Sequence, residues 1–398
     1  MVKKSLASWP AYSIEEADAV KNVLLSNKVN YWTGEYCKEF EKEFASWIGT
    51  KHATALSNGT IALDLSLRAL NIKGLGSTSN MPEVIVTSRT FIASASSIIN
   101  IGAKPVFVDI DRDSQNISIE NIKSAITKNT CAIICVHLAG WPCEMDKIMD
   151  FAKLNNLYVI EDCAQAHGAS YKGQMVGSFG DIAAWSFCQD KIMTTGGEGG
   201  MVTTNNDKFW HYVWSYKDHG KSFHKVFNIK HADGFRWLSD SFGTNARMTE
   251  MQAVIGLTQL RKMTEWKKIR SKNAQSILEF CKKFPKSLRA PIPPNFIEHA
   301  WYKCYIFVKP EGIKDSWSRD LIIKEINKIG IPCFSGSCPE VYLEKAFEKT
   351  NFRPKDRLAV SKEIGETSLM FLVHPSLTDE EIKQTCSAID KVMNMAEK

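Results

Sequence analysis

The stretch "LYVIEDCAQAHGASYKGQMVGSFGDIAAWSFCQDKIMTTGGEGGMVTT", residues 157–204, decides the fold of this chain. It contains three runs that are nearly continuous in apolar residues, which is typical of strands covered on both faces of a sheet. Asp162 ends the first run, and Lys191 follows the second run after a few residues. Open α/β sheets bind their ligands at the carboxyl ends of their strands. The stretch therefore predicts an α/β sheet with a carboxylate and a lysine at its ligand-binding edge. The three runs are 157–162, 182–187 and 199–204.

Three further apolar runs precede this stretch, and helical patterns separate the runs. One such pattern, within 142–156, places Met145, Ile148, Met149 and Ala152 along one face of a helix. The alternation of strands and helices predicts a sheet rich in parallel strands. The further runs are "VIVTS" (84–88), "KPVFVDI" (104–110) and "CAIICVHL" (131–138), and a second helix is predicted within "NGTIALDLSLRALNI" (58–72).

A marked helix is also predicted near the N-terminus, in "SIEEADAVKNVLLS" (13–26). Ser13 and Glu16 have the spacing of a capping box, in which each group bonds to the backbone N–H of the other. The apolar residues of this helix repeat at helical spacing and predict a buried face. That face comprises Ile14, Ala17, Val20 and Leu24.

The pattern changes near residue 250, which we take as a domain boundary. Residues 248–284 form a long helical stretch, with one break considered near 263. Thr378 and Glu381 form a second capping box that opens a final helix. We therefore expect a large domain, residues 1–250, and a smaller C-terminal α+β domain, residues 251–398. The Pro-rich turn between them and the strand candidates of the small domain are 289–296, 303–310 and 331–336.

Composition excludes several classes of protein. The net charge of +6 is mild for 398 residues, and the sequence has no basic block, so nucleic acid is not an expected partner. No window approaches the roughly 18 apolar residues of a membrane span, and the N-terminal segment has no signal-like apolar region. The eleven cysteines are scattered, without CxxC or zinc spacing. We expect reduced thiols, a cytoplasmic location and no metal site.

Three chemical groups occur together in the first half of the chain. Residues 57–60, "SNGT", precede an amphipathic helix whose N-terminal N–H groups suit an anion. Asp162 suits a cationic ring nitrogen, and Lys191 suits an aldehyde. Each has an ordinary alternative: a helix cap for 57–60, a cap or salt bridge for Asp162, and a solvated charge for Lys191. Together they match pyridoxal phosphate (PLP), which needs a lysine, a carboxylate and phosphate donors.

The chain resembles the DegT/DnrJ/EryC1/StrS aminotransferases, the sugar-aminotransferase branch of the fold-type I PLP enzymes. The resemblance covers nearly the whole chain, with several motifs in the order of the family. It implies a large domain with a mostly parallel seven-stranded sheet between helices. The motifs include "FEKEFASWIGTKHATALSNGTIALDLSL" (40–67), "TFIASASSIINIGAKPVFVDID" (90–111), "EDCAQAHGASYKGQMVGSFGDIAAWSF" (161–187), "DKIMTTGGEGGMVTTN" (190–205) and "NARMTEMQAVIGLTQL" (245–260).

The resemblance implies roles for individual residues. Lys191 is similar to the lysine that binds PLP covalently and moves the proton, and Asp162 to the partner of the pyridine nitrogen. Asn245 is similar to an asparagine that reaches the phosphate from the other subunit, which implies a homodimer with shared active sites. The remaining implied cofactor-binding residues are Gly59, Thr60 and Ser186 at the phosphate, Phe91 stacked on the ring and Gln165 beside it.

The segment 217–243 has no clear period and is dense in lysine and aromatic residues. A long irregular segment in a compact domain is often functional. We interpret it as a substrate loop, in which His219, Lys221 and Arg236 would bind the substrate, with a plain surface excursion as the alternative. His137 and His167 are interpreted as hydrogen-bonded interior histidines rather than bases.

The function implied is transfer of an amino group from glutamate, or glutamine, to a nucleotide-linked keto sugar for surface polysaccharide or glycan biosynthesis. A 4-keto-6-deoxyhexose is the favoured substrate type. Aminotransferases acting on an inosose or a 3-keto sugar remain alternatives, as does a non-enzymatic regulator that keeps the fold. Family dehydratases carry histidine in place of the lysine, so Lys191 argues against that branch.

Overall fold

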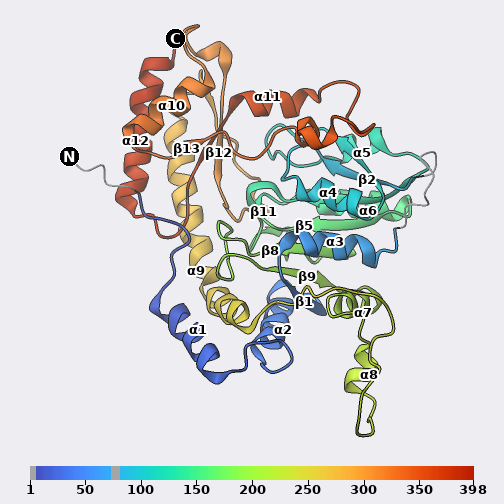
Figure 1. The fold of residues 1–398 in the computed structure, drawn as a ribbon. Coiled ribbons are helices and arrows are strands. Elements are labelled where there is room, and N and C mark those ends of the chain that lie inside the picture. Colours follow the sequence, from blue (N-terminus) through green and yellow to red (C-terminus); the bar gives the residue numbers. More distant parts are fainter. Residues whose placement is uncertain (1–5, 73–80) are drawn as a thin grey trace.

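The structure is a computed structural model that describes residues 6–72 and 81–398. A seven-stranded sheet with helices on both faces forms the centre of its larger part (Figure 1). The strand order is β1-β9-β8-β5-β4-β2-β3, in which β9 alone runs antiparallel to its neighbours. This confirms the mostly parallel seven-stranded sheet. The strands are β1 His52–Leu56, β2 Glu83–Thr87, β3 Lys104–Val108, β4 Thr130–Val136, β5 Tyr158–Asp162, β8 Ile182–Ser186 and β9 Gly200–Thr204.

Both faces of this sheet are buried, as the continuous apolar runs predict. In β2, Val84 and Val86 pack beneath α3, α4 and α7, whereas Ile85 points to the opposite side, beneath α5 and α6. In α6, Met145, Ile148 and Ala152 are buried and Met149 is half-buried, which confirms the predicted face. The helices of this part are α1 Ile14–Ser26, α2 Tyr36–Ile48, α3 Gly59–Ala69, α4 Ala93–Asn100, α5 Ile119–Ala125, α6 Met145–Leu154 and α7 Asp207–Tyr216.

All six predicted strands of the sheet are present, but β1 was not predicted. Its sequence, "HATAL", lacks the run of β-branched residues that marks the other strands. It forms one edge of the sheet, where it pairs only with β9.

The predicted buried face of α1 is wrong, although its capping box between Ser13 and Glu16 is confirmed. Ile14 is 76% exposed and Leu24 is 51% exposed, whereas Glu16 and Val23 are buried. The reason lies in α9, on which α1 packs: Lys262 Nζ lies 3.0 Å from Glu16 Oε1. This ion pair holds the Glu16 side of α1 against α9 and leaves Ile14 and Leu24 on the surface.

A single helix, α9 (Glu250–Cys281), links the two cores of the molecule and has no break near residue 263. Its first half packs under the large sheet through Ala253 and Leu257, and its second half joins the C-terminal core through Ala274 and Ile277. The domain boundary at 250 coincides with its first residue and remains a prediction. The C-terminal elements are α10 Arg319–Ile329, α11 Ala359–Thr367, α12 Asp379–Ala396 and a sheet of β10 Leu288–Arg289, β12 Cys304–Val308, β14 Ser368–Phe371 and β13 Cys333–Phe334.

Two smaller features complete the fold. A three-stranded sheet pairs β11 (Ile297–Glu298) with β6 (Ser170–Tyr171) and β7 (Gln174–Met175). The 217–243 segment carries one short helix, α8 (Phe223–Phe227), and projects away from the body below α7 in Figure 1. Trp237 is 78% exposed and Phe242 is 98% exposed in this segment. Within the described residues, no helix has the length and apolar character needed to cross a membrane.

Candidate active site

Asp162 is the last residue of β5 and is almost completely buried. The Ser94 hydroxyl donates a hydrogen bond of 2.7 Å to Asp162 Oδ2, and the Ala164 N–H donates one of 3.2 Å to Oδ1. Burial raises the pKa of the Asp162 carboxyl, although Ser94 and the nearby charge of Lys191 oppose the shift. No ion pair to Asp162 exists within residues 6–72 and 81–398. A buried carboxylate that has hydrogen bonds but no ion pair is suited to a cationic partner.

The neighbouring residues hold the end of β5 rigidly. Glu161 points to the opposite face of the sheet, where His137 Nε2 lies 3.0 Å from its Oε2. The Cys143 N–H donates to His137 Nδ1, so the other ring nitrogen carries the proton towards Glu161. Cys163 lies close to both groups, but the ring nitrogens of His137 are already engaged, which argues against a metal ion. His137 is therefore the hydrogen-bonded interior histidine expected. The same expectation is wrong for His167, because both of its ring nitrogens are buried without a hydrogen-bond partner in the described part of the chain and the ring packs on Trp185 and Phe187 instead.

A cradle for an anion forms where β8 ends beside the N-terminus of α3. Gly59 is the first residue of α3, and a Cβ atom at this position would lie 2.6 Å from Ser186 Cβ. A Cβ atom on Gly200 would lie 2.3 Å from the Asn58 carbonyl oxygen. Asn58 caps only the Ile61 N–H, so the first N–H groups of the helix have no intrahelical acceptor. The predicted phosphate residues Gly59 and Ser186 are thus brought together, and only glycine permits this approach.

Lys191 lies in the turn after β8, with its side chain 17% exposed. Its Nζ atom is 3.3 Å from Asp190 Oδ1, and the Trp9 indole N–H donates a hydrogen bond of 2.8 Å to its carbonyl oxygen. The Tyr302 hydroxyl donates to Asp190 Oδ2. Burial acts to raise the pKa of Asp190, but Lys191 and Tyr302 outweigh it and hold that pKa below its usual range. Lys191 thus faces a fixed, ionised carboxylate.

Other predicted cofactor residues surround this centre less closely. Gln165 accepts a hydrogen bond of 2.8 Å from the Ala139 N–H, which fixes its amide. Phe91 is 68% exposed and follows Thr90, whose hydroxyl lies 2.8 Å from that of Ser94. Thr60 and Asn245 are exposed. Thr60 follows Gly59 in α3, and the carbonyl of Ala246, next to Asn245, accepts a hydrogen bond of 2.9 Å from the Ser57 N–H just before that helix. Their contacts with a cofactor remain predictions.

The predicted substrate residues lie in the 217–243 segment, and their contacts with a substrate remain predictions. Lys221 Nζ lies 3.0 Å from Asp218 Oδ1 and 4.3 Å from the centre of a Trp32 ring. His219, beside Asp218, has a left-handed backbone with φ of 59°. Arg236 is exposed in the 217–243 segment.

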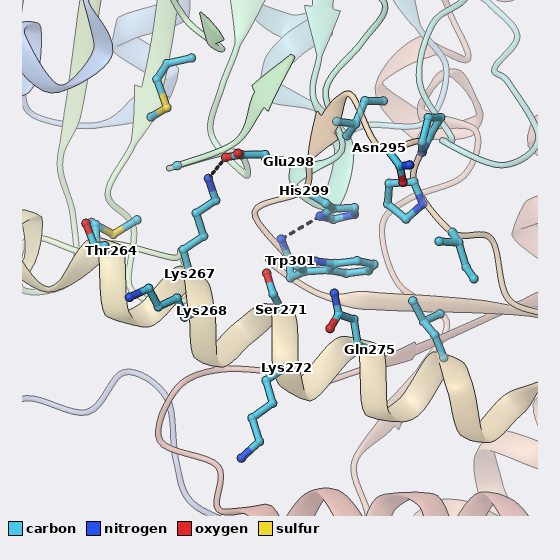
Figure 2. Close-up of a pocket in the computed structure, with 18 of the residues that line it drawn as sticks. Thr264, Lys267, Lys268, Ser271, Lys272, Gln275, Asn295, Glu298, His299 and Trp301 are labelled. Carbon is cyan, nitrogen blue, oxygen red and sulfur yellow. Dashed lines mark hydrogen bonds and ion pairs between the residues drawn. The ribbon is translucent and has the colours of Figure 1, made fainter. Parts of the chain in front are cut away.

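A cavity among the described residues lies apart from this site. It has a volume of about 790 Å³ and runs along α9, where Lys267, Ser271 and Gln275 point into it (Figure 2). Lys267 pairs with Glu298 there. Trp301 also lines this cavity, whereas the next residue, Tyr302, contacts Asp190 on the active-site side. The α9 groove therefore lies behind the catalytic centre.

The groups at the ends of β5 and β8 fit PLP: a carboxylate without a cation, a lysine, and a helix N-terminus that a glycine keeps open. Fold and site together define a PLP-dependent transferase of fold type I. The sequence model of the DegT/DnrJ/EryC1/StrS aminotransferase family matches residues 11–390, and the chain belongs to this family.

Similar proteins agree with this membership. The chain is 34% identical over 383 residues to GDP-perosamine synthase of Escherichia coli O157:H7, with 96% of each chain covered. It is 32% identical over 380 residues, 96% of each chain, to dTDP-3-amino-3,6-dideoxy-alpha-D-galactopyranose transaminase of Aneurinibacillus thermoaerophilus. An X-ray structure of an aminotransferase from Psychrobacter cryohalolentis has 57% identity and a TM-score of 0.95, with 98% of this chain and 99% of that chain covered. The chain is a PLP-dependent sugar aminotransferase.

Sequence reasoning missed several residues of the site. Ser94 supports Asp162, and Gly200 keeps the anion cradle open. Asp190 and Tyr302 act as a pair, although 112 positions separate them. Among these residues, only Asp190 could have been found from the sequence, because it directly precedes Lys191 in the same motif.

Proposed function

We propose that this enzyme transfers the amino group of glutamate, or glutamine, to a keto sugar carried on a nucleoside diphosphate, with a 4-keto-6-deoxyhexose as the favoured sugar. The observation that carries the proposal is the convergence of Asp162, Lys191 and the Gly59–Ser186 cradle at the ends of adjacent strands. The names of the two relatives above, a GDP-linked and a dTDP-linked sugar enzyme, support a nucleotide sugar. Inosose and 3-keto sugar substrates are the alternatives.

The residues of this chain would divide the chemistry among them. PLP supplies an electron sink for the carbanion at the donor carbon. Asp162 would accept a hydrogen bond from the pyridine nitrogen and keep the proton there. The N-terminus of α3 and the Ser186 hydroxyl would bind the phosphate. Lys191 would hold the cofactor and then move the proton at the donor carbon. Asp190 and Tyr302 would keep the turn that carries Lys191 in place during this transfer.

We also propose that the active unit is a cytoplasmic homodimer with shared sites. Exposed apolar residues support an interface: Ile14 is 76% exposed on α1, and Phe242 is 98% exposed in the 217–243 segment. Asn245 would reach the phosphate of the partner's site, and His219, Lys221 and Arg236 would approach the partner's substrate. All eleven cysteines are free, in agreement with a reducing compartment. A role in surface polysaccharide or glycan synthesis would follow from the product.

The proposal is tested with the purified, PLP-loaded protein. Glutamate should bleach the visible absorbance of the bound cofactor and yield 2-oxoglutarate. A nucleotide-linked 4-keto-6-deoxyhexose should then restore the absorbance and yield an amino sugar that mass spectrometry detects. Bleaching without restoration by any nucleotide keto sugar, but with restoration by an inosose, would replace the sugar-nucleotide assignment. Absence of bleaching by both glutamate and glutamine would overturn the proposal.

Borohydride reduction identifies the covalent residue independently. It should label the tryptic peptide that contains Lys191. Lys191→Ala should still bind PLP without turnover, and a label on another lysine would refute the role of Lys191.

A further inference from the structure

Positive charge exceeds negative charge beside the catalytic lysine. Two ammonium groups lie over one aromatic ring: Lys191 Nζ is 5.3 Å and Lys303 Nζ is 4.7 Å from the centre of the Tyr302 ring. Arg270 lies behind this ring, and its charge acts on both Lys303 and Tyr302. The carboxylate facing this group is Asp190, which already contacts Lys191 and Tyr302. One carboxylate therefore faces three cations.

Arg270 is a buried charge without an ion-pair partner in the described part of the chain. The guanidinium donates one hydrogen bond, from Nη1 to the Trp301 carbonyl oxygen at 3.3 Å, and it lies 4.9 Å from the centre of a Trp9 ring. Its Nε and Nη2 atoms are buried and have no hydrogen-bond partner within residues 6–72 and 81–398. Buried charges are normally paired, so this arginine leaves an unbalanced positive potential on its neighbours.

Lys303 is the accessible member of this group. It is half-buried immediately before β12, and no ion pair or hydrogen bond holds its ammonium among the described residues. Burial lowers the pKa of Lys303 to about 8, and Arg270 and Lys191 act in the same direction while Asp190 opposes them. A bound anion would relieve this unfavourable environment. The location restricts that anion to molecules that react at Lys191.

We propose that Lys303 binds the side-chain carboxylate of the amino donor and thereby selects glutamate over glutamine, with Arg270 as a positioning residue behind it. This inference rests on the proposed function. The α-carboxylate of a donor is bonded to the reacting carbon and must stay beside Lys191. The side-chain carboxylate extends further, and Lys303 lies over the same Tyr302 ring as the reacting amine of Lys191. A neutral amide there would leave the cations unpaired, because it carries no charge.

Separate half-reactions test this assignment with the PLP-loaded enzyme. Lys303→Met should raise the KM for glutamate about 10- to 100-fold, the loss of one charge-assisted hydrogen bond, and should abolish the preference over glutamine. The half-reaction in which the amino-loaded enzyme aminates the keto sugar should change less than about twofold. Lys268→Met is the matched control. Lys268 lines the α9 groove of Figure 2, so this substitution removes the same charge from the other side of α9.

A pH profile separates binding from a structural role. Wild-type kcat/KM for glutamate should fall above about pH 8, as the Lys303 ammonium loses its proton and its attraction for a carboxylate. Lys303→Arg should keep activity with glutamate and move this fall to higher pH, since a guanidinium stays charged. The groups that face Lys303 are Asp190, Lys191, Arg270, Tyr302 and His374, and they are unchanged in this variant.

Calorimetric titration with glutarate, which cannot react, gives a readout independent of turnover. Glutarate should bind both the wild type and Lys303→Arg. Its affinity for Lys303→Met should be at least tenfold weaker than for the wild type. Equal loss in both half-reactions of Lys303→Met, or glutamine as the better donor of the wild type, would overturn the inference and leave the proposed function intact. An enzyme inert to both donors would overturn the proposed function, and the glutarate titration alone would then decide whether Lys303 binds a carboxylate.

Discussion

Replacing Asp162 by asparagine should stabilise the protein without PLP and weaken its binding of PLP. Asparagine has nearly the shape of aspartate, and it can keep one acceptor for the Ala164 N–H and offer its amide to Ser94. The fold should therefore survive. The substitution removes a buried charge that two donors satisfy incompletely, since a carboxylate can accept about four hydrogen bonds. The expected gain in the free energy of unfolding is about 1–3 kcal/mol.

The pH dependence of this gain has a definite sign. Burial raises the pKa of Asp162 in the fold, so the folded carboxyl resists ionisation while the unfolded one ionises near pH 4. Stability of the PLP-free wild type therefore falls as pH rises above about 4, until the folded group also ionises. The advantage of Asp162→Asn should be full at neutral pH and should shrink as pH falls towards about 4, where both states of the wild type are protonated.

Binding of PLP should respond in the opposite direction. The charge-assisted hydrogen bond to the pyridine nitrogen contributes about 1.5–3 kcal/mol, so the dissociation constant should rise about 10- to 150-fold. Thermal unfolding at pH 4.5 and 7.5, together with titration of PLP, measures both effects. An Asp162→Asn protein that is less stable without PLP at pH 7.5, or that binds PLP as tightly as the wild type, would refute the reasoning.

Two further predictions concern the phosphate cradle and the dimer. Gly59→Ala should place a Cβ atom 2.6 Å from Ser186 Cβ, and overpacking of about 1–3 kcal/mol should lower both the melting temperature and the affinity for PLP. Unchanged PLP affinity of Gly59→Ala would refute the cradle. Inactive Lys191→Ala and Asn245→Ala subunits, when mixed, should regain activity, because one site of each mixed dimer then carries neither substitution. Verified mixed dimers without activity would argue against a shared site.

Local patterns predicted the part of the site that lies on consecutive strands. The apolar runs that end at Asp162 and before Lys191 form the adjacent parallel strands β5 and β8, so their order alone brought the two residues to one edge. The face of α1 could not be predicted in the same way. Its helical period is correct, but Lys262 of α9 decides which side is buried, and that ion pair joins residues far apart in the chain.

The same limit applies to the charge environment of Lys191. Tyr302 and Lys303 come from the segment before β12, and Trp9 comes from a segment 182 positions before Lys191. No periodicity connects these positions, and each residue has an ordinary role when considered alone.

The arrangement of these distant residues gives the two halves of the site different electrostatic tasks. At the ends of β5 and β8, the buried carboxylate of Asp162 has no cationic partner among the described residues, and the N–H groups of α3 suit an anion. This half of the site therefore matches the charges of PLP itself. On the side of β12, Lys303 and Arg270 supply positive charge that no ion pair within the described residues neutralises, and in the proposed site the phosphate of PLP would bind at the α3 cradle instead. That charge lies next to Lys191, the side chain at which the donor amino acid would react. The C-terminal core supplies Lys303 and the large sheet supplies Asp162, and α9 belongs to both cores, so the packing of the two cores on this helix fixes where Lys303 lies relative to Asp162.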